Sequence, residues 1–363
     1  MNPTWRYIEN DGVAASTGLA ADEWLMTTGG PLVRLYTYRS SCALVGKFQN
    51  LEAEIDLGFC RATEIPVNRR PTGGGAIVMG EDQLGIAVIH SSRAPGVPEH
   101  PKEIFARYGG AIMTGLERLG IRASLEAKND IRVLGRKIAG LGVCRNEDGA
   151  FLFHTSLLVD LDVDLMLRVL KIPAEKISDK LRAKVADNLT TVRRETARPI
   201  PITMSEVREA IREGFAVSEG VRLERRDLTV DEVEAIGRLE EEKYLQDAWI
   251  FRRQPTPDAN GTSLRKTPAG LLRLYLSLAG DRIKDVTITG DFVSEENVLL
   301  ALEKDLSRLP ADEAAIAAAI ARHEAELGGL RAADLVSAIL EAAAEARKTS
   351  SQGQAYGCFV DVR

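Results

Sequence analysis

The segment Arg69-Arg70-Pro71-Thr72-Gly73-Gly74-Gly75-Ala76 places two arginines and a hydroxyl directly before three glycines. Glycine lets backbone N–H groups approach a ligand closely, and guanidinium groups match phosphate oxygens in pairs. Further along, Gly135-Arg136-Lys137-Ile138-Ala139-Gly140 sets one lysine between glycines in an apolar setting. An ammonium there can stabilise negative charge on phosphate oxygens. Together, the two segments favour a site that holds a phosphate ester against bare backbone.

Both segments also have simpler explanations. A run of three glycines is often only a turn, because glycine accepts positive φ. A single lysine is usually a solvated surface group. The P-loop pattern GxxxxGK[ST] and the dinucleotide pattern GxGxxG are both absent from the sequence. The segments therefore do not match either common nucleotide-binding motif.

Four further residues are candidates for chemistry. Asn129 and Asp130 either form a turn or supply an oxygen ligand, Asp130, to magnesium. His154 lies in an apolar run typical of a strand, where a histidine is more often a core residue than a catalyst. Cys144 is the only cysteine near these motifs, and only Arg145 beside it favours a thiolate.

The bulk composition narrows the class of protein. A chain of 363 residues predicts two domains. A net charge of −6 argues against a nucleic-acid partner. The four cysteines are scattered, which favours reduced thiols over a disulfide framework. The first residues lack signal-peptide character, and no apolar run is long enough to cross a bilayer. We therefore expect a cytoplasmic protein without a membrane association.

Strand-like and helix-like runs alternate along the chain and predict an α+β fold. Leu32–Tyr38 is typical of a strand, and helical spacing of apolar residues extends from Ile104 to Leu119. Capping boxes start at Thr203 and Thr229. Ser16 and Thr17 can cap a short helix, and the residues from Ala311 to Leu327 are expected to form a first alanine-rich helix. Prolines and glycines predict a linker over Gln254–Gly270. The predicted division is a catalytic domain over 1–246, a linker over 247–270 and a small α+β accessory domain over 271–363.

These motifs, in this order, resemble the lipoate–protein ligase A family, within the group that includes biotin protein ligases and octanoyltransferases. The matching segments are Arg69–Ala76, Lys128–Asp130, Gly135–Gly140, His154–Leu158 and Asp187–Leu189. The hairpin before Gly290-Asp291-Phe292 resembles the accessory domain of the longer bacterial ligases. The resemblance thus covers nearly the whole chain. It implies mixed sheets flanked by helices in the catalytic domain.

The resemblance implies a reaction in two steps. ATP and lipoate give lipoyl-AMP and pyrophosphate, and the lipoyl group then passes to a lysine ε-amine on a carrier domain. The implied carriers are the lipoyl domains of E2 subunits, the glycine-cleavage H protein or a related lipoate-binding protein. ATP and Mg²⁺ are the implied cofactors.

The resemblance also implies roles for individual residues. Lys137 would be the catalytic residue that contacts the acyl and phosphate oxygens of the adenylate. Asn129 and Asp130 would serve the nucleotide and its magnesium. The lipoyl and phosphate pocket would be shaped by Arg70, Thr72, Gly73, Gly74 and Gly75. Arg145, His154 and Asn188 are weaker matches, and the basic loop 176–188 either closes over the adenylate or is an ordinary solvated loop.

The chain departs from the family pattern at several positions, which leaves alternatives open. Met79-Gly80 replaces a usual His-Asp, and Thr155 replaces a glycine. One alternative is an octanoyl- or lipoyltransferase of the same fold, which works without ATP through a cysteine thioester. Another is a non-catalytic protein that binds lipoate or an adenylate. Biotin ligation is a weaker option, because the GRGRxGR type of loop is absent.

Overall fold

The computed structural model describes residues 2–171, 179–196 and 198–353. Within it, the chain forms two compact units. The first contains Met1–Leu44, Glu54–Thr72 and Ala76–Ile250, and the second contains Val45–Ala53, Gly73–Gly75 and Phe251–Arg363. Each unit is described by itself below. The second unit thus includes two short segments from the N-terminal part of the chain, outside the domain range expected for it.

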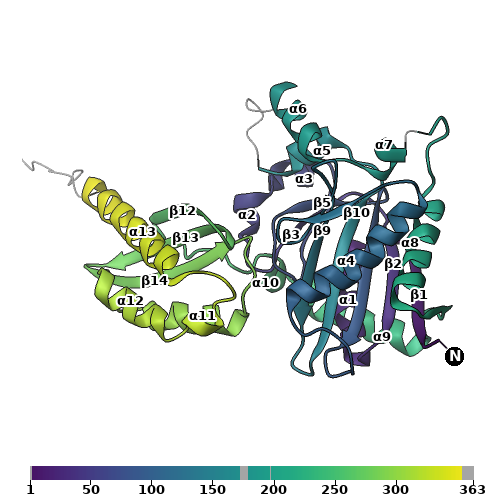
Figure 1. Ribbon diagram of the computed structural model, residues 1–363. Coiled ribbons are helices and arrows are strands. Elements are labelled where there is room, and N and C mark those ends of the chain that lie inside the picture. The colour runs from purple at the N-terminus through teal and green to yellow at the C-terminus, as the bar shows by residue number, and fades with distance from the viewer. Residues whose placement is uncertain (1, 172–178, 197, 354–363) are drawn as a thin grey trace, which may run out of the picture. The chain divides into compact units, whose positions relative to one another are not determined.

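An eight-stranded mixed sheet organises the first unit (Figure 1). Its order is β11-β1-β2-β6-β10-β9-β8-β7, in which β1 runs parallel to both neighbours and the other described pairs are antiparallel. The fold is therefore α+β, as the sequence predicts. The strands are β1 (Thr4–Val13), β2 (Leu32–Tyr38), β6 (Gln83–Ser91), β7 (Ser124–Glu126), β8 (Asp130–Val133), β9 (Arg136–Arg145), β10 (Ala150–Leu158) and β11 (Arg222–Arg225).

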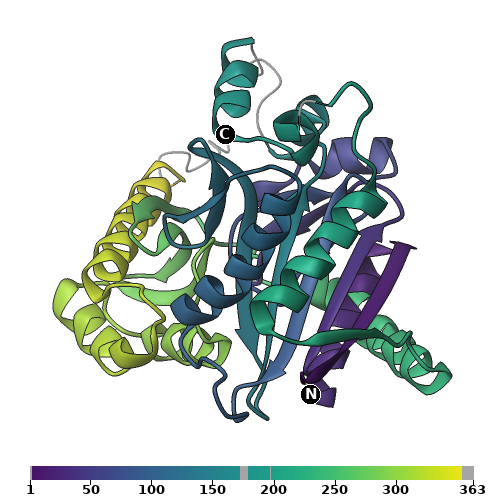
Figure 2. The same ribbon diagram turned by 45° about the vertical axis from the view of Figure 1, so that its right-hand side comes forward.

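Helices α4 (Pro101–Arg118) and α8 (Met204–Glu219) cover one face of this sheet (Figure 2). They bury Ile112 and Phe215 against sheet residues such as Phe151. The two helices approach closely, because a Cβ added at Gly214 would lie 2.5 Å from the backbone oxygen of Ala111. Side chains alternate between the two faces along each strand, and those on the other face of the sheet pack in a second core. This core also contains residues of α1 (Ala15–Leu25) and α9 (Val230–Leu239).

The remaining elements of the first unit are short. A small sheet of order β4-β3-β5 lies apart from the main sheet. The elements are η1 (Met26–Thr28), β3 (Cys42–Val45), α3 (Leu57–Ala62), β4 (Val67–Arg69), β5 (Ile77–Met79), α5 (Val163–Val169), α6 (Asp179–Asn188), α7 (Val192–Thr196), the π-helical turn η3 (Glu240–Tyr244) and α10 (Asp247–Ile250).

The second unit packs helices on one face of an antiparallel three-stranded sheet, with order β12-β13-β14. Leu272, Leu274 and Leu276 alternate along the central strand and are fully buried, as their spacing predicts. The elements are α2 (Leu51–Glu54), β12 (Gly261–Thr267), β13 (Gly270–Ala279), β14 (Arg282–Gly290), α11 (Glu296–Leu306), α12 (Glu313–Ala321), η4 (Glu324–Glu326) and α13 (Ala332–Gly353).

Three expected elements differ in the structure. The predicted linker contains a full strand, β12, which pairs with β13 from Gly261 to Thr267. The first alanine-rich helix ends at Ala321, before the 3-10 turn η4. Ser16 and Thr17 do not cap α1, because their hydroxyls instead donate to Glu240 at 2.6 and 2.9 Å. The contacts of Ser16 and Thr17 with Glu240 depend on a partner more than 200 residues away in the sequence.

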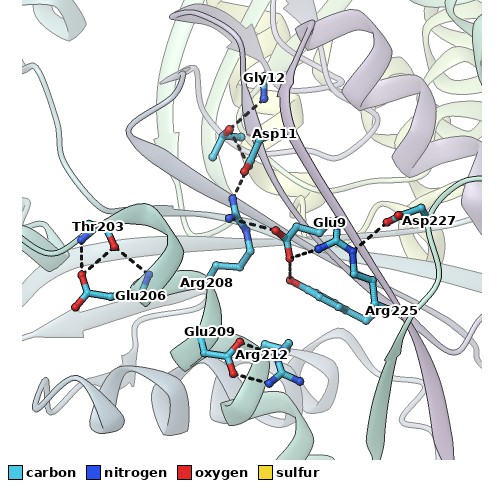
Figure 3. Close-up of polar contacts among 12 residues, drawn as sticks. Glu9, Asp11, Gly12, Thr203, Glu206, Arg208, Glu209, Arg212, Arg225 and Asp227 are labelled. Carbon is cyan, nitrogen blue, oxygen red and sulfur yellow. Dashed lines mark hydrogen bonds and ion pairs between the residues drawn. The ribbon is translucent and has the colours of Figure 1, made fainter.

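A charged network ties β1, β11 and α8 together near one edge of the main sheet (Figure 3). Arg208 of α8 pairs with Asp11 and lies 3.6 Å from Glu9. Arg225 of β11 lies 3.5 Å from Glu9 and 3.3 Å from Asp227. The arginines of this edge are thus paired with carboxylates of the neighbouring elements.

Candidate active site

Lys137 lies near the start of β9, and both its ammonium group and its backbone have bonding partners. Its Nζ lies 2.8 Å from Oδ1 of Asp130, and its side chain is 36% exposed. Its backbone oxygen accepts a hydrogen bond of 2.9 Å from the amide of Thr190. Asp130 also accepts, through Oδ2, a hydrogen bond of 2.8 Å from Arg132. The ammonium is therefore reachable from solvent but is tied to a neighbouring carboxylate.

A β-bulge decides which face of the sheet Lys137 occupies. The register between β8 and β9 shifts, so that Ile131 opposes Ala139 whereas Arg132 opposes Lys137. The extra residue, Ile138, lies in the same buried core as Ala139. Because a bulge breaks the alternation of side chains, Lys137 reaches the face that carries Gly140. A Cβ added at Gly140 would lie only 2.7 Å from the Lys137 Nζ.

Thr72 and His154 contact each other over Gly142, which lies two residues after Gly140 in β9. The Thr72 hydroxyl and the His154 Nε2 are 2.6 Å apart and share a hydrogen bond. Both lie over Gly142, where an added Cβ would be 2.9 Å from the imidazole ring and 3.3 Å from the hydroxyl oxygen. Burial, and secondarily the charge of Arg70, lowers the pKa of His154 to about 3. The imidazole is therefore neutral at physiological pH.

Gly140 and Gly142 join these groups into one site. Residues two apart on a strand share a face, so both glycines lie on the side opposite α4 and α8. Lys137 and Asp130 lie over the first glycine, whereas Thr72 and His154 lie over the second. We call the backbone of Gly140 and Gly142 the glycine floor; the ammonium of Lys137 lies over its first residue and the neutral imidazole of His154 over its second.

Asn129 supports this floor from the neighbouring segment. Its side-chain amide donates to the backbone oxygen of Leu141 at 2.7 Å, and its own backbone oxygen accepts from the Leu141 amide at 2.7 Å. Both bonds fix the strand residue between the two glycines. Asn129 therefore has a structural role in this structure, and its predicted contact with a nucleotide stays a prediction.

The triple glycine belongs to the second unit and has packing reasons of its own. A Cβ added at Gly73 would lie 2.5 Å from the backbone oxygen of Phe292. Gly74 has a φ of 95°, which favours glycine. Its backbone oxygen approaches Gly46 so closely that a Cβ there would lie 2.0 Å away. Gly75 is less crowded, with only Asp291 at 4.0 Å. Their predicted part in a phosphate pocket stays a prediction.

Two of the weaker candidates, Arg145 and Asn188, are exposed, and Asn188 precedes Leu189, which forms a β-bridge with Lys137. Arg145 is exposed at the end of β9. Because side chains alternate between the two faces of a strand, Arg145 lies on the opposite face of the sheet from Gly142. Asn188 is exposed and donates to the backbone oxygen of Lys184 at 2.6 Å. The expected loop 176–188 is helical from Asp179, and its first residues lie outside the described part of the chain.

No cysteine of the described residues lies beside Lys137. Cys144 is on the same face of β9 as Gly140 but four residues along the strand, a separation of about 13 Å. Cys42 and Cys60 are buried, and burial raises the pKa of both thiols. Cys358 lies outside the described part of the chain. The described residues thus offer no thiolate within reach of the ammonium.

No group of three or more His, Cys, Asp or Glu residues that could hold a metal occurs within residues 2–171, 179–196 and 198–353. Magnesium bound with phosphates needs only one or two carboxylates. However, both oxygens of Asp130 already face cations, namely Lys137 and Arg132. Its predicted metal role stays a prediction.

The sequence contained a signal for this floor that the motifs alone do not reveal. Gly140-Leu141-Gly142 places glycine at alternate positions of a strand. That spacing clears one face of the sheet while Leu141 stays buried on the other. The Asp130–Lys137 pair had no such signal, because it depends on the register between two strands.

Two family models match the chain. The model of the lipoyl protein ligase A/B catalytic domain matches residues 14–216, more than half of the chain. The chain belongs to this family. The model of the bacterial lipoate protein ligase C-terminus matches residues 256–339. The protein is therefore an enzyme of the lipoate ligase family, of transferase or ligase type.

Curated relatives of this enzyme include octanoyltransferases. The octanoyltransferase LipM of Anoxybacillus flavithermus is 30% identical over 277 residues, covering 69% of this chain and 98% of the relative. The octanoyltransferase LipM of Bacillus subtilis is 27% identical over 278 residues, covering 69% and 99%. The enzyme is thus longer than these two transferases, which leave nearly a third of it unmatched.

Solved structures with the same fold include lipoate–protein ligases. The bipartite ligase of Thermoplasma acidophilum, studied with its E2 lipoyl domain, has 25% identity and a TM-score of 0.62, covering 70% of this enzyme and 100% of that chain. Lipoate-protein ligase A bound with ATP has 25% identity and a TM-score of 0.58, covering 69% and 98%. Plasmodium falciparum LipL1 in complex with lipoate covers 92% and 99% with a TM-score of 0.72, but at 16% identity it supports the fold alone.

Among the described residues, every helix is too short or too polar to cross a bilayer.

Proposed function

We propose that this enzyme joins a lipoyl or octanoyl group to the ε-amine of a lysine on a lipoyl carrier domain. The family supports acyl transfer, and the ammonium of Lys137 and the neutral imidazole of His154 lie over neighbouring glycines on one face of β9, where they can bind the oxygens of a carboxylate or ester. The Thermoplasma acidophilum relative works with an E2 lipoyl domain. By analogy, the proposed acceptors are E2 subunits, the glycine-cleavage H protein or a related lipoyl carrier.

We propose further that the acyl group is activated with ATP. The observation that carries this choice is the distance of about 13 Å along β9 between Cys144 and Gly140, over which the Lys137 ammonium lies. A thioester on Cys144 would form away from the cation. The match to a bacterial lipoate protein ligase C-terminus agrees with this choice, as does the fold shared with a ligase bound to ATP.

The proposed reaction balances as two displacements. The carboxylate oxygen of the fatty acid bonds to the α-phosphorus of ATP, and the bond to pyrophosphate breaks. The carrier amine then bonds to the carbonyl carbon, AMP leaves with the bonding electrons, and the amine loses a proton. Lys137 stabilises the charge that develops on the α-phosphate oxygens. Arg70, which is buried near His154, adds a second fixed positive charge.

The curated relatives favour a second candidate, transfer of octanoate from an acyl donor without ATP. Both LipM proteins match nearly their full length to this enzyme. This candidate is better supported by the relatives than ATP-dependent ligation, which the sequence placed first. Such a reaction needs a nucleophile that accepts the acyl group and releases it to the carrier lysine.

One assay separates the two candidates. The purified enzyme is mixed with a lipoyl carrier domain and either lipoate, ATP and magnesium, or octanoyl-acyl carrier protein without ATP. The carrier is then measured by intact mass. Ligation predicts a lipoyl adduct only with ATP, whereas octanoyl transfer predicts an adduct in the ATP-free reaction. If neither mixture modifies any candidate carrier, the proposed function is wrong.

A further inference from the structure

Asp130 lies where it can control the direction of the Lys137 ammonium. We propose that Asp130 and Gly140 are positioning residues for Lys137: the carboxylate holds the amine, and the glycine leaves the space through which the side chain reaches it. This proposal rests on the role proposed above for Lys137. It assigns Asp130 to the lysine and not to a metal ion.

The geometry of the two strands supports this role. The β-bulge brings Lys137 to the face of Gly140, and Asp130 directly opposes Gly140 across the ladder. The lysine side chain therefore runs along its own strand, over the glycine, to reach the carboxylate at 2.8 Å. Any side chain at Gly140 would occupy that path, because an added Cβ lies 2.8 Å from Cε and 2.7 Å from Nζ.

The surroundings of Asp130 fix the carboxylate itself. Its side chain is only 13% exposed, and its second oxygen pairs with Arg132 at 2.8 Å. Arg132 is in turn anchored by a hydrogen bond of 2.8 Å to the backbone oxygen of Gly135. The carboxylate thus bridges two cations and has a single orientation. This orientation fixes where the ammonium of Lys137 lies.

The chemistry explains why a positioning residue is needed here. Lysine ends in a compact charge on a flexible four-carbon stem. The backbone of Lys137 is fixed by Thr190, and Arg136 beside it pairs with Glu195 at 2.8 Å. Removal of the Asp130 carboxylate therefore frees only the charged end of the Lys137 side chain, while the backbone stays in place. Since small displacements of a catalytic group slow a reaction, the loss falls mainly on the rate and less on substrate binding.

The test compares Asp130→Asn, Gly140→Ala and the double variant with the wild type. Each is assayed in whichever reaction the wild type performs, with kcat and KM measured separately and with magnesium varied. Asp227→Asn is the matched control, because this aspartate also pairs with an arginine but lies beyond β11 at the opposite edge of the sheet (Figure 3). Gly110→Ala is the control for glycine, since an added Cβ there meets nothing within 4 Å.

The proposal predicts that each single variant lowers kcat by about 10- to 100-fold, with KM within about threefold of wild type. The kcat of the double variant is at most about threefold below that of the slower single variant, because both changes release the same amine. The magnesium concentration for half-maximal rate stays unchanged. The two control variants keep wild-type kcat.

Three results would overturn the proposal. One is a folded Asp130→Asn or Gly140→Ala variant with kcat within about twofold of wild type. Another is a loss of kcat in the double variant that equals the product of the losses in the two single variants. The third is a higher magnesium requirement in Asp130→Asn, which would make Asp130 a metal ligand. If Asp130→Asn does not fold, Gly140→Ala decides alone. An inactive wild type would instead contradict the proposed function.

Discussion

The hydroxyl of Thr72 lies 2.6 Å from Nε2 of His154, and the two groups meet over the bare backbone of Gly142. This contact joins the segment before the triple glycine to the centre of the main sheet, within the first unit. It also fixes the imidazole of His154, which is neutral because burial lowers its pKa to about 3.

His154 therefore contributes to the pH dependence of stability with a definite sign. Its pKa is about 3 when folded and about 6.5 when unfolded. Between these values the unfolded chain binds a proton that the folded chain does not. Stability from this residue is thus complete above pH 6.5 and falls as the pH drops, by at most about 1.4 kcal/mol per pH unit.

NMR titration of the histidine C2 protons checks this prediction. We expect the His154 resonance to stay constant between about pH 5 and pH 8, and His154→Gln to remove the corresponding acid destabilisation in denaturant unfolding. A normal titration of His154 within that range would contradict the assigned environment.

Gly142→Ala should damage the contact between Thr72 and His154. The new methyl group would lie 2.9 Å from the imidazole and force it to move, at a cost of about 1–3 kcal/mol in the free energy of unfolding. Gly110→Ala in α4 should be neutral or stabilising by up to about 1 kcal/mol, because the site is open and helical. Denaturant unfolding of both variants gives the comparison. Equal stabilities would show that Gly142 has no packing role.

Cys144→Ala should keep the rate of carrier acylation. The reason is the separation of this thiol from Lys137 along β9, which leaves Cys144 without a role as an acyl acceptor. The rate is measured by intact mass of the carrier, with Cys358→Ala as a parallel variant. Loss of activity in Cys144→Ala, together with an octanoyl adduct on this cysteine in the wild type, would favour the transferase instead.

Regular elements were predictable from the sequence where the signal was local. The strand Leu32–Tyr38 has its predicted bounds, and both capping boxes form, with Thr203 and Thr229 each bonded to the glutamate three residues later. Local hydrogen bonding and alternation of apolar residues suffice for these elements. By contrast, β12 contains only one large apolar residue, the exposed Leu264, and follows Pro255 and Pro257, so its own sequence does not indicate a strand. It forms a strand because it pairs with β13.

The site was predictable in its residue types but not in its contacts. Lys137 was expected beside a strand, and it lies within one. Its contact with Asp130 was not predicted, because a sequence does not reveal that an inserted residue, Ile138, turns the lysine toward that carboxylate. For His154, a core position and a weaker role in substrate binding were both considered. Its strand is apolar as predicted, and its side chain lies over the glycine floor.

The second unit should depend on Gly46. A methyl group at this position would lie 2.0 Å from the backbone oxygen of Gly74, so Gly46→Ala must displace the triple glycine and should cost more than about 1 kcal/mol. Limited proteolysis should show faster cleavage within residues 251–353 than in the wild type. Gly237→Ala, where an added Cβ meets nothing, is the control. Identical cleavage of all three proteins would contradict the packing described.

Release of pyrophosphate on mixing enzyme, lipoate, ATP and magnesium tests the role of Lys137 most directly. We predict that the wild type releases pyrophosphate without any carrier protein, and that folded Lys137→Ala does so about 100- to 1000-fold more slowly, because the charge on the α-phosphate loses its cation. Circular dichroism confirms that the variant is folded. Release at the wild-type rate by the folded variant, or none from the wild type, would contradict an adenylating site built around this lysine.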